Sequence, residues 1–184
     1  HPSVASSYGN IGGVGRHKGE YDKALEYYQK SLAIWLKILG ADHPNVATIC
    51  NNIGLVHDEK GEHDKALEYF SEALAIRLKK QGPDHPAVAQ SYNNIGNVYY
   101  AKGDYDQALE YHQKALAIRL KQLGPGHPSV AISYWSIGGA WEGKKDMAKA
   151  KEFIGKGHSI LLKQLGSNHP HTKQCKAQLD ALNK

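Results

Sequence analysis

The sequence lacks the features that mark membrane, secreted and nucleic-acid-binding proteins. No apolar run approaches the roughly 18 residues that a membrane-spanning helix needs, and the N-terminus has no basic segment followed by an apolar one. Lysine and arginine alternate with aspartate and glutamate, without a block of about five or six like charges. We therefore expect a cytoplasmic protein that binds neither a membrane nor nucleic acid.

Cysteine is also scarce, and a disulfide is not expected. The 2 cysteines of the 184-residue chain, Cys50 and Cys175, fall in different copies of an internal repeat, which would hold them far apart. We interpret both as reduced packing residues. Hydrophobic residues make up 41% of the chain, enough to bury a core, and the formal net charge of +5 is compatible with a weak attraction to acidic partners.

A repeat of 42 residues runs through the chain. The dipeptide His-Pro recurs at this interval, beginning at His1, His43, His85, His127 and His169. The segments NNIGLV and NNIGNV, which start at Asn51 and Asn93, are related by the same interval. Such self-similarity is typical of repeat architectures. We therefore divide the chain into four repeats and a tail, with bounds at 1–42, 43–84, 85–126, 127–168 and 169–184.

Each repeat is predicted to form two helices. In the third repeat the first helix opens at Pro86, because proline suits the first helical turn, and it stops near Gly103. Its apolar side chains recur on one face at helical spacing: Val88, Tyr92, Ile95 and Tyr99. The second helix is predicted to start around Asp104 to Asp106 and to end at Gly124-Pro125. No segment alternates with a period of two, so the predicted fold class is all-α.

The third repeat resembles the tetratricopeptide repeat (TPR). The residues that match the family pattern are Tyr92, Ile95, Gly96, Tyr99, Gly103, Asp104, Tyr105, Ala108 and Ala115. The usual repeat has about 34 residues; this longer form, with its DHPxVA openings and NNIG segments, resembles the cargo-binding domain of kinesin light chains and nephrocystin-like proteins. The resemblance implies a right-handed α-solenoid of tandem helix-turn-helix repeats.

The outer repeats depart from this pattern. Lys145 and Met147 replace the glycine and tyrosine of the turn in the fourth repeat, and Gly157 replaces an alanine. The tail, residues 169–184, keeps a narrower apolar row and is predicted to be a capping helix. The first repeat has no matching cap, which suggests a longer array or a multidomain protein.

The sequence offers no arrangement that predicts catalysis. Gly138 to Lys144 has the spacing of a phosphate-binding loop, but Lys145 follows where serine or threonine is needed and no strand precedes it. Five of the 11 histidines belong to the His-Pro openings, and no histidine or cysteine pair has zinc spacing. We therefore expect no enzymatic activity, no cofactor and no metal.

The candidate site is a groove, which the resemblance places along the first helices of the repeats. Asparagine carries both a donor and an acceptor, so a row of asparagines can pair with the main chain of an extended peptide. The candidate asparagines are Asn51, Asn52, Asn93, Asn94 and Asn97. The second asparagine of each pair can equally cap or brace neighbouring helices.

Aromatic and basic residues complete the candidate peptide-binding set. Tyr100 and Trp135 fall at groove positions, where tryptophan offers a shelf for an apolar side chain or packs between repeats. Arg16, Arg77 and Arg119 are interpreted either as solvated or salt-bridged side chains or as contacts for an acidic ligand.

The sequence thus predicts a noncatalytic scaffold of the cargo or adaptor type, which binds a peptide segment of another protein. The alternative is a structural module that self-associates or stacks on another domain through its uncapped first repeat.

Overall fold

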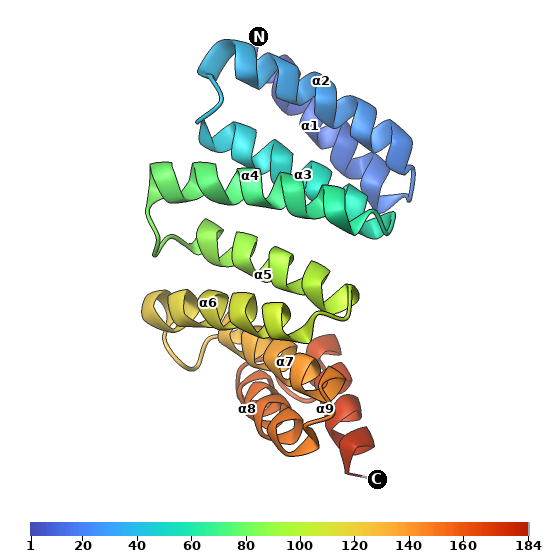
Figure 1. The fold of residues 1–184 in the computed structure, drawn as a ribbon, viewed down its shortest axis with the longest axis vertical. Helices are drawn as coiled ribbons and strands as arrows, with labels where there is room; N and C mark the ends of the chain where they lie inside the picture. Colours follow the sequence, from blue (N-terminus) through green and yellow to red (C-terminus); the bar gives the residue numbers. More distant parts are fainter. Residues whose placement is uncertain (184) are drawn as a thin grey trace. The chain divides into compact units, whose positions relative to one another are not determined.

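The computed structural model describes residues 1–183, and the regular structure in this range is helical throughout. The described residues form nine helices, labelled in Figure 1: α1 (Pro2–His17), α2 (Tyr21–Leu39), α3 (Pro44–Glu59), α4 (His63–Gln81), α5 (Pro86–Ala101), α6 (Tyr105–Leu123), α7 (Pro128–Gly143), α8 (Met147–Leu165) and α9 (Pro170–Leu182). The bounds of α5 and α6 confirm the helix pair predicted for the third repeat. None of the described helices combines the length and apolar composition that crossing a bilayer requires.

The histidine of each His-Pro opening caps the helix that follows it. Nδ1 of His43 accepts a hydrogen bond from the backbone N–H of Asn45 at 3.1 Å, and Nδ1 of His85 accepts one from Ala87 at 3.1 Å. The side chains of His1, His127 and His169 likewise accept a hydrogen bond from the backbone N–H of the residue two positions further along the chain. The cap satisfies a backbone N–H that has no partner within the helix, and proline adds no further unpaired N–H. Sequence reasoning noticed the histidines and missed this role.

The turn between the two helices of each pair contains a residue in the left-handed backbone conformation. Gly19, Gly61 and Gly103 take φ angles of 75°, 76° and 79° there, and Lys145 occupies the same turn of the fourth pair with φ of 63°. A side chain disfavours this conformation, which glycine adopts without steric cost.

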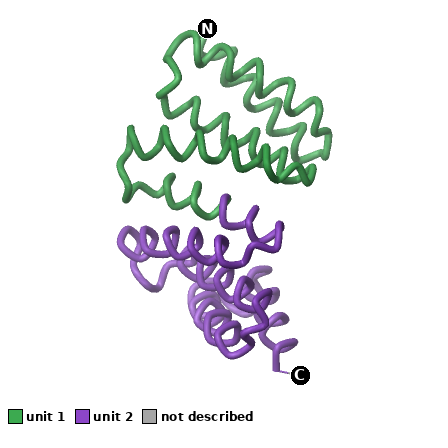
Figure 2. Tube along the Cα trace, in the orientation of Figure 1, with its two compact units in different colours: residues 1–94 green, residues 95–184 purple. Residues whose placement is uncertain are grey.

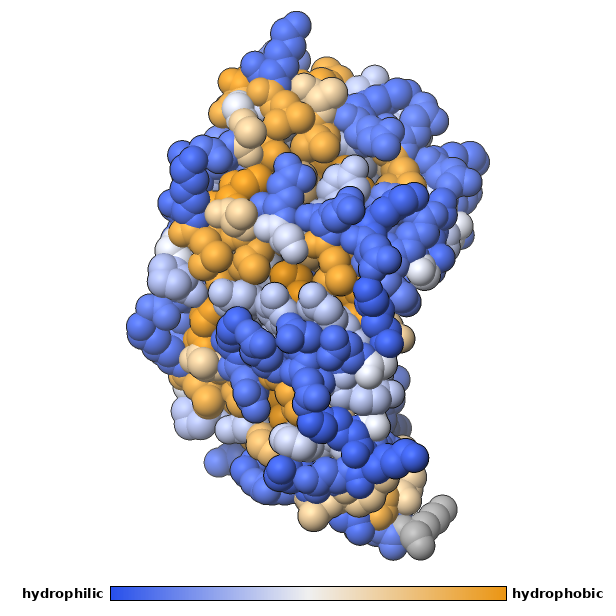
Figure 3. Space-filling view, in the orientation of Figure 1, coloured by the Kyte–Doolittle hydropathy of each residue, from blue (hydrophilic) through white to orange (hydrophobic). Residues whose placement is uncertain are grey.

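Two compact units make up the chain: unit 1, His1–Asn94, and unit 2, Ile95–Lys184. Figure 2 shows that α5 contributes to both. The core of unit 1 is built around Tyr28, Trp35 and Ile53 from its helix pairs. In unit 2, one cluster contains Ala108 and Ile137, and another contains Ile154, Leu161 and Cys175. On the face seen in Figure 3, hydrophilic residues are interspersed with hydrophobic ones.

Glycines let the two helices of a pair pack closely. A Cβ atom on Gly96 would lie 2.8 Å from the imidazole ring of His112, and one on Gly54 would lie 2.8 Å from the ring of Phe70. Both distances are shorter than van der Waals contact. A side chain at either glycine would therefore push the two helices of the pair apart.

Both cysteines are free and buried. Burial raises the pKa of Cys50 to about 12 and that of Cys175 to about 11. At neutral pH both therefore remain thiols, which react slowly because the thiolate is the nucleophile.

Candidate functional site

Two of the predicted asparagines are occupied by contacts inside unit 1. Asn51 is 7% exposed, and its Oδ1 accepts hydrogen bonds from Nδ2 of Asn94 at 3.0 Å and from Nη1 of Arg77 at 3.4 Å. Asn94 is also buried, and its Oδ1 accepts from Nε2 of Gln90 at 2.9 Å. Asn93 is buried as well. These contacts favour bracing between α3 and α5 over ligand binding for Asn51 and Asn94.

Arg77 is buried, which corrects the expectation of a solvated or salt-bridged side chain. Its Nη1 donates to Oγ of Ser91 at 2.6 Å and to the carbonyl oxygen of Ala87 at 3.1 Å. Arg119, one repeat further on, is half-buried and donates to Oγ of Ser133 at 2.7 Å. Burial lowers the pKa of both guanidinium groups, yet arginine stays charged at neutral pH. Each arginine therefore joins a second helix to the next first helix.

The outer junctions place apolar pairs at these same repeat positions. Between the first and second repeats, Trp35 and Ile49 occupy the positions that Arg77 and Ser91 hold between the second and third. Between the fourth repeat and the tail, Leu161 and Cys175 occupy them. These four residues are all buried. The two positions thus change together. Comparing residues 14 apart across the repeats would have revealed this relation.

Arg16 and Trp135 also have partners within their own units. Nη1 of Arg16 pairs with Oε1 of Glu59 at 2.9 Å. Nε1 of Trp135 donates to Oε1 of Gln178, and Nε2 of Gln178 in turn donates to Oε2 of Glu142. This chain of hydrogen bonds joins α7 to α9 and fixes the edge of the indole ring.

Unit 1 contains a hollow of about 220 Å³ between its first helices. It is lined by Ser6, Gly9, Asn10, Trp35, Asn45, Thr48, Ile49 and Asn52. The amides of Asn10, Asn45 and Asn52 have no side-chain hydrogen bond with the described residues. Asn52 belongs to the predicted set; Asn10 was missed, although it lies one repeat before Asn52.

Unit 2 contains a larger cavity, of about 340 Å³. Its lining includes three predicted residues, Asn97, Tyr100 and Trp135, and others that sequence reasoning missed: His112, Ile132, Ser136, Gly139, His171, Gln174 and Gln178. The amides of Asn97 and Gln174 have no hydrogen-bond partner among residues 1–183. The cavity therefore combines apolar walls with open amide groups.

No cationic histidine from α6 contributes to this cavity at neutral pH. Burial, and to a lesser extent the charge of Arg119, lowers the pKa of His112 from 6.5 to about 4. Within residues 1–183, no group of three or more histidine, cysteine, aspartate or glutamate side chains is placed to hold a metal ion. The other polar groups of its lining are the side-chain amides, the hydroxyl groups of Tyr100 and Ser136, the indole N–H of Trp135 and the imidazole of His171.

The chain belongs to the tetratricopeptide repeat family, whose model matches residues 3–79, 60–121 and 87–163. No curated protein sequence matches the chain. Among solved structures it is similar to BtubC (BKLC) from P. vanneervenii, with 28% identity and a TM-score of 0.81; the match covers 92% of this chain and 68% of that one.

Two further solved structures have the same fold. A putative kinesin light chain from Podosopora anserina, with nearly identical TPR-like repeats, has 25% identity and a TM-score of 0.82 over 99% of this chain and 86% of that one. Aspartyl phosphate phosphatase F from Bacillus subtilis has 15% identity and a TM-score of 0.83, covering 98% of this chain and 44% of that one. The likeness to the phosphatase concerns the fold alone. The fold class is therefore an all-α solenoid of TPR type, of the kind found in protein-interaction scaffolds.

Proposed function

We propose that the chain is a noncatalytic adaptor that binds an extended peptide segment of a partner protein along its first helices. One observation carries the proposal: the amides without internal partners line the hollows of the two units, whereas Asn51 and Asn94 are used in packing. An amide that can donate and accept pairs with the N–H and C=O of an extended main chain whatever its sequence. Asn52 and Asn97 are therefore the predicted residues that we retain as peptide contacts.

The cavity of unit 2 supplies specificity. Tyr100, Trp135 and Ile132 give it apolar walls, and Asn97 and Gln174 present free amides beside them. An apolar or aromatic side chain of the peptide fits the walls, while the amides pair with its main chain. The proposed ligand is therefore a cargo-type peptide with one large apolar residue.

The test is a selection of random peptides displayed on phage, repeated on a variant whose cavity is filled. A Cβ on Gly139 has only the ring of Tyr100 nearby, at 3.8 Å, so Gly139→Leu extends into the cavity without displacing backbone. Gly155→Leu is the matched control, because a Cβ there meets nothing within 4 Å. Both variants gain helix propensity.

A motif that contains a large apolar residue, binds the original chain and the Gly155→Leu chain, and loses at least tenfold in affinity for Gly139→Leu supports the proposal. Fluorescence of Trp135 gives a second readout, since the ring lines the cavity. Enrichment that is insensitive to Gly139→Leu places the peptide elsewhere, and no enrichment on the folded chain rejects peptide binding.

A further inference from the structure

His112 places a polar ring where two other repeats have an apolar side chain. It is 2% exposed, packs on Gly96 of α5 and lines the cavity of unit 2. Its equivalents in the second and fourth repeats, Phe70 and Ile154, pack on the equivalent glycines. Packing of the helix pair therefore does not require an imidazole, and the buried polar atoms of this ring need another explanation.

The two ring nitrogens of His112 have different surroundings. A Cβ on Gly96 would lie 2.8 Å from Nδ1 and 3.1 Å from Nε2. Nδ1 is buried and has no hydrogen-bond partner among residues 1–183. Because Nδ1 is enclosed although the ring lines the cavity, Nε2 is the nitrogen that a ligand can reach.

The ring of His112 carries a single proton at neutral pH, because burial lowers its pKa to about 4. A buried N–H without an acceptor is rarer in proteins than a buried acceptor without a donor. The enclosed Nδ1 is therefore the unprotonated nitrogen, and the proton lies on Nε2. The ring thus offers one N–H donor to the cavity.

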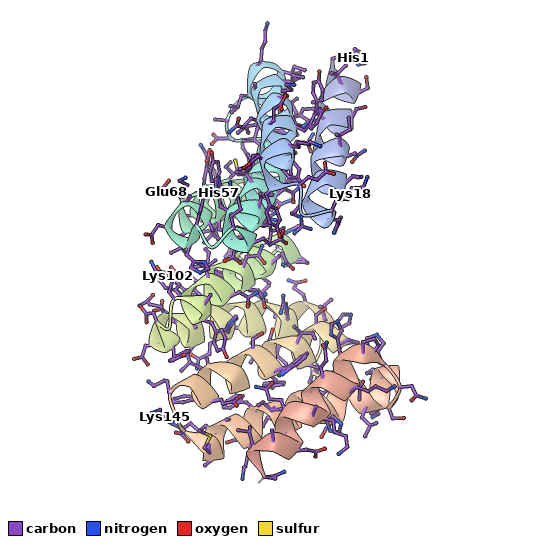
Figure 4. The ribbon with its side chains drawn as sticks, turned by 90° about the vertical axis from the view of Figure 1, so that its right-hand side faces the viewer. His1, Lys18, His57, Glu68, Lys102 and Lys145 are labelled. Atoms are coloured by element: carbon purple, nitrogen blue, oxygen red, sulfur yellow. The ribbon has the colours of Figure 1, made fainter. Side chains whose placement is uncertain are left out.

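The cavity offers no charged carboxylate, ammonium or guanidinium group to a ligand. Its lining among the described residues contains no aspartate, glutamate, lysine or arginine. Lys102 and Lys145, which Figure 4 labels at the turns of unit 2, are exposed and do not belong to the lining. A charged ligand group would lose its hydration here without gaining a counter-charge of this kind. The group that meets Nε2 is therefore an uncharged acceptor.

The rest of the lining indicates which side chain carries this acceptor. Tyr100, Ile132 and Trp135 form apolar walls that suit an aromatic ring. Asn97 and Gln174 add amide oxygens that accept a hydrogen bond. A phenol combines all three properties, because its ring is apolar and its hydroxyl group both accepts and donates.

We infer that His112 is a specificity-determining residue, and that the side chain received by the cavity is a tyrosine of the bound peptide. The tyrosine oxygen accepts a hydrogen bond from Nε2 of His112, and its O–H donates to the amide oxygen of Asn97 or Gln174. Phenylalanine leaves Nε2 unpaired, and tryptophan brings an N–H donor to another donor. The inference rests on the proposed function and narrows its large apolar residue to one amino acid.

The position of the proton on His112 is measured by long-range proton–nitrogen correlation in the NMR spectrum of the full chain. The His112→Phe variant assigns the signal by its disappearance. We expect a protonated Nε2 and an unprotonated Nδ1. A proton on Nδ1 overturns the inference, because Nε2 would then accept a hydrogen bond and an indole N–H would fit.

Two phage libraries probe the cavity, with random sequence on both sides of a fixed tyrosine or a fixed phenylalanine. The tyrosine library is expected to enrich peptides that lose binding to the cavity-filling variant Gly139→Leu. Replacing this tyrosine by phenylalanine or tryptophan is expected to weaken binding about tenfold or more, because a buried donor loses its acceptor. Equal affinities of the tyrosine and phenylalanine peptides overturn the inference and leave the proposed function standing.

The His112→Phe variant tests whether this residue is responsible for the preference. A phenyl ring fits the position, as Phe70 packs on Gly54. The variant is expected to lose the preference for tyrosine over phenylalanine. Tyr28→Phe is the matched control, because it removes a hydroxyl group from the equivalent buried position of the first repeat, outside the cavity, and is expected to retain the preference. A preference that survives His112→Phe overturns the inference, and so does a parallel loss of both peptides, which would assign His112 a structural role.

Side-chain analogues separate this inference from the proposed function. p-Cresol and toluene, which match the side chains of tyrosine and phenylalanine, are titrated while the ring signals of His112 and Trp135 are followed by NMR. If neither library enriches a peptide on the folded chain, peptide binding is rejected and the analogues decide alone. Tighter binding of p-cresol that His112→Phe abolishes supports the role of His112. Equal binding of the two analogues, or none, overturns it.

Discussion

The amide of Asn94 donates a hydrogen bond to Oδ1 of Asn51 at 3.0 Å, from one first helix to the preceding one. Asn51 is buried and Asn52 lines the hollow of unit 1, although the two are neighbours in sequence. Asn51→Ala is expected to lower the free energy of unfolding by about 1–3 kcal/mol, because it removes the acceptor of the buried Asn94 amide, whereas Arg77 keeps its hydrogen bonds to Ser91 and Ala87. Chemical denaturation measures the change.

Asn52→Ala is the control for this substitution. Its amide makes no hydrogen bond to a described side chain, so the unfolding free energy is expected to change by less than about 0.5 kcal/mol. Under the proposed function it weakens peptide binding instead. Equal stability losses at the two positions would contradict the division between a bracing and a groove-lining asparagine.

The Arg77–Ser91 pair predicts a strong coupling between two positions. Arg77→Leu alone leaves buried polar groups unpaired and is expected to cost about 1–3 kcal/mol. Adding Ser91→Cys reproduces the Leu161 and Cys175 combination found at the last junction and is expected to recover most of that loss. A double-mutant cycle of unfolding free energies measures the coupling, and additive effects would show that the pair acts as two independent residues.

Much of the fold could be predicted from the sequence because the 42-residue interval displays helix ends, turns and apolar faces several times. The site was harder to predict. Asn51 and Asn52 look alike in NNIGLV, and their difference depends on where Asn94 of the next repeat packs. Burial of Arg77 likewise depends on Ser91, 14 residues away across a turn. Local sequence patterns predict which segments are helical. The roles of the polar residues where two repeats meet depend instead on contacts between those repeats.

His112 makes stability depend on pH in a defined window. Its pKa falls from 6.5 to about 4 because the ring is buried, so the unfolded chain takes up this proton first as the pH decreases. The contribution of the neutral imidazole to the free energy of unfolding is therefore fully present above pH 6.5. About 3 kcal/mol of it is lost as the pH falls towards 4. Melting temperatures measured across this range are expected to decrease accordingly.

His112→Phe isolates this contribution. Phe70 packs on Gly54 as His112 packs on Gly96, with a Cβ distance of 2.8 Å in both cases, so a phenyl ring fits. The variant also removes the buried Nδ1, which has no hydrogen-bond partner among residues 1–183. It is therefore expected to be more stable at neutral pH and to lose less stability between pH 6.5 and 4. An unchanged pH slope would assign the effect to other groups.

Two glycines of α8 are expected to respond in opposite directions to the same substitution. A Cβ on Gly155 meets no atom within 4 Å, whereas one on Gly157 would lie 2.8 Å from the carbonyl oxygen of Ala131. Gly155→Ala is expected to raise the unfolding free energy by about 0.5–1 kcal/mol, because alanine loses less backbone entropy in a helix. Gly157→Ala makes the same gain but forces α7 and α8 apart, for a net loss of about 1–3 kcal/mol.

The opposite signs separate helix propensity from helix packing, since both substitutions lie on one helix and add the same methyl group. Thermal unfolding followed by circular dichroism measures both variants under identical conditions. The position of Gly157 holds alanine in the second and third repeats, at Ala73 and Ala115. A stabilising Gly157→Ala would contradict this prediction. It would show that α7 and α8 can separate enough to accommodate a methyl group, as the helices of the second and third repeats do.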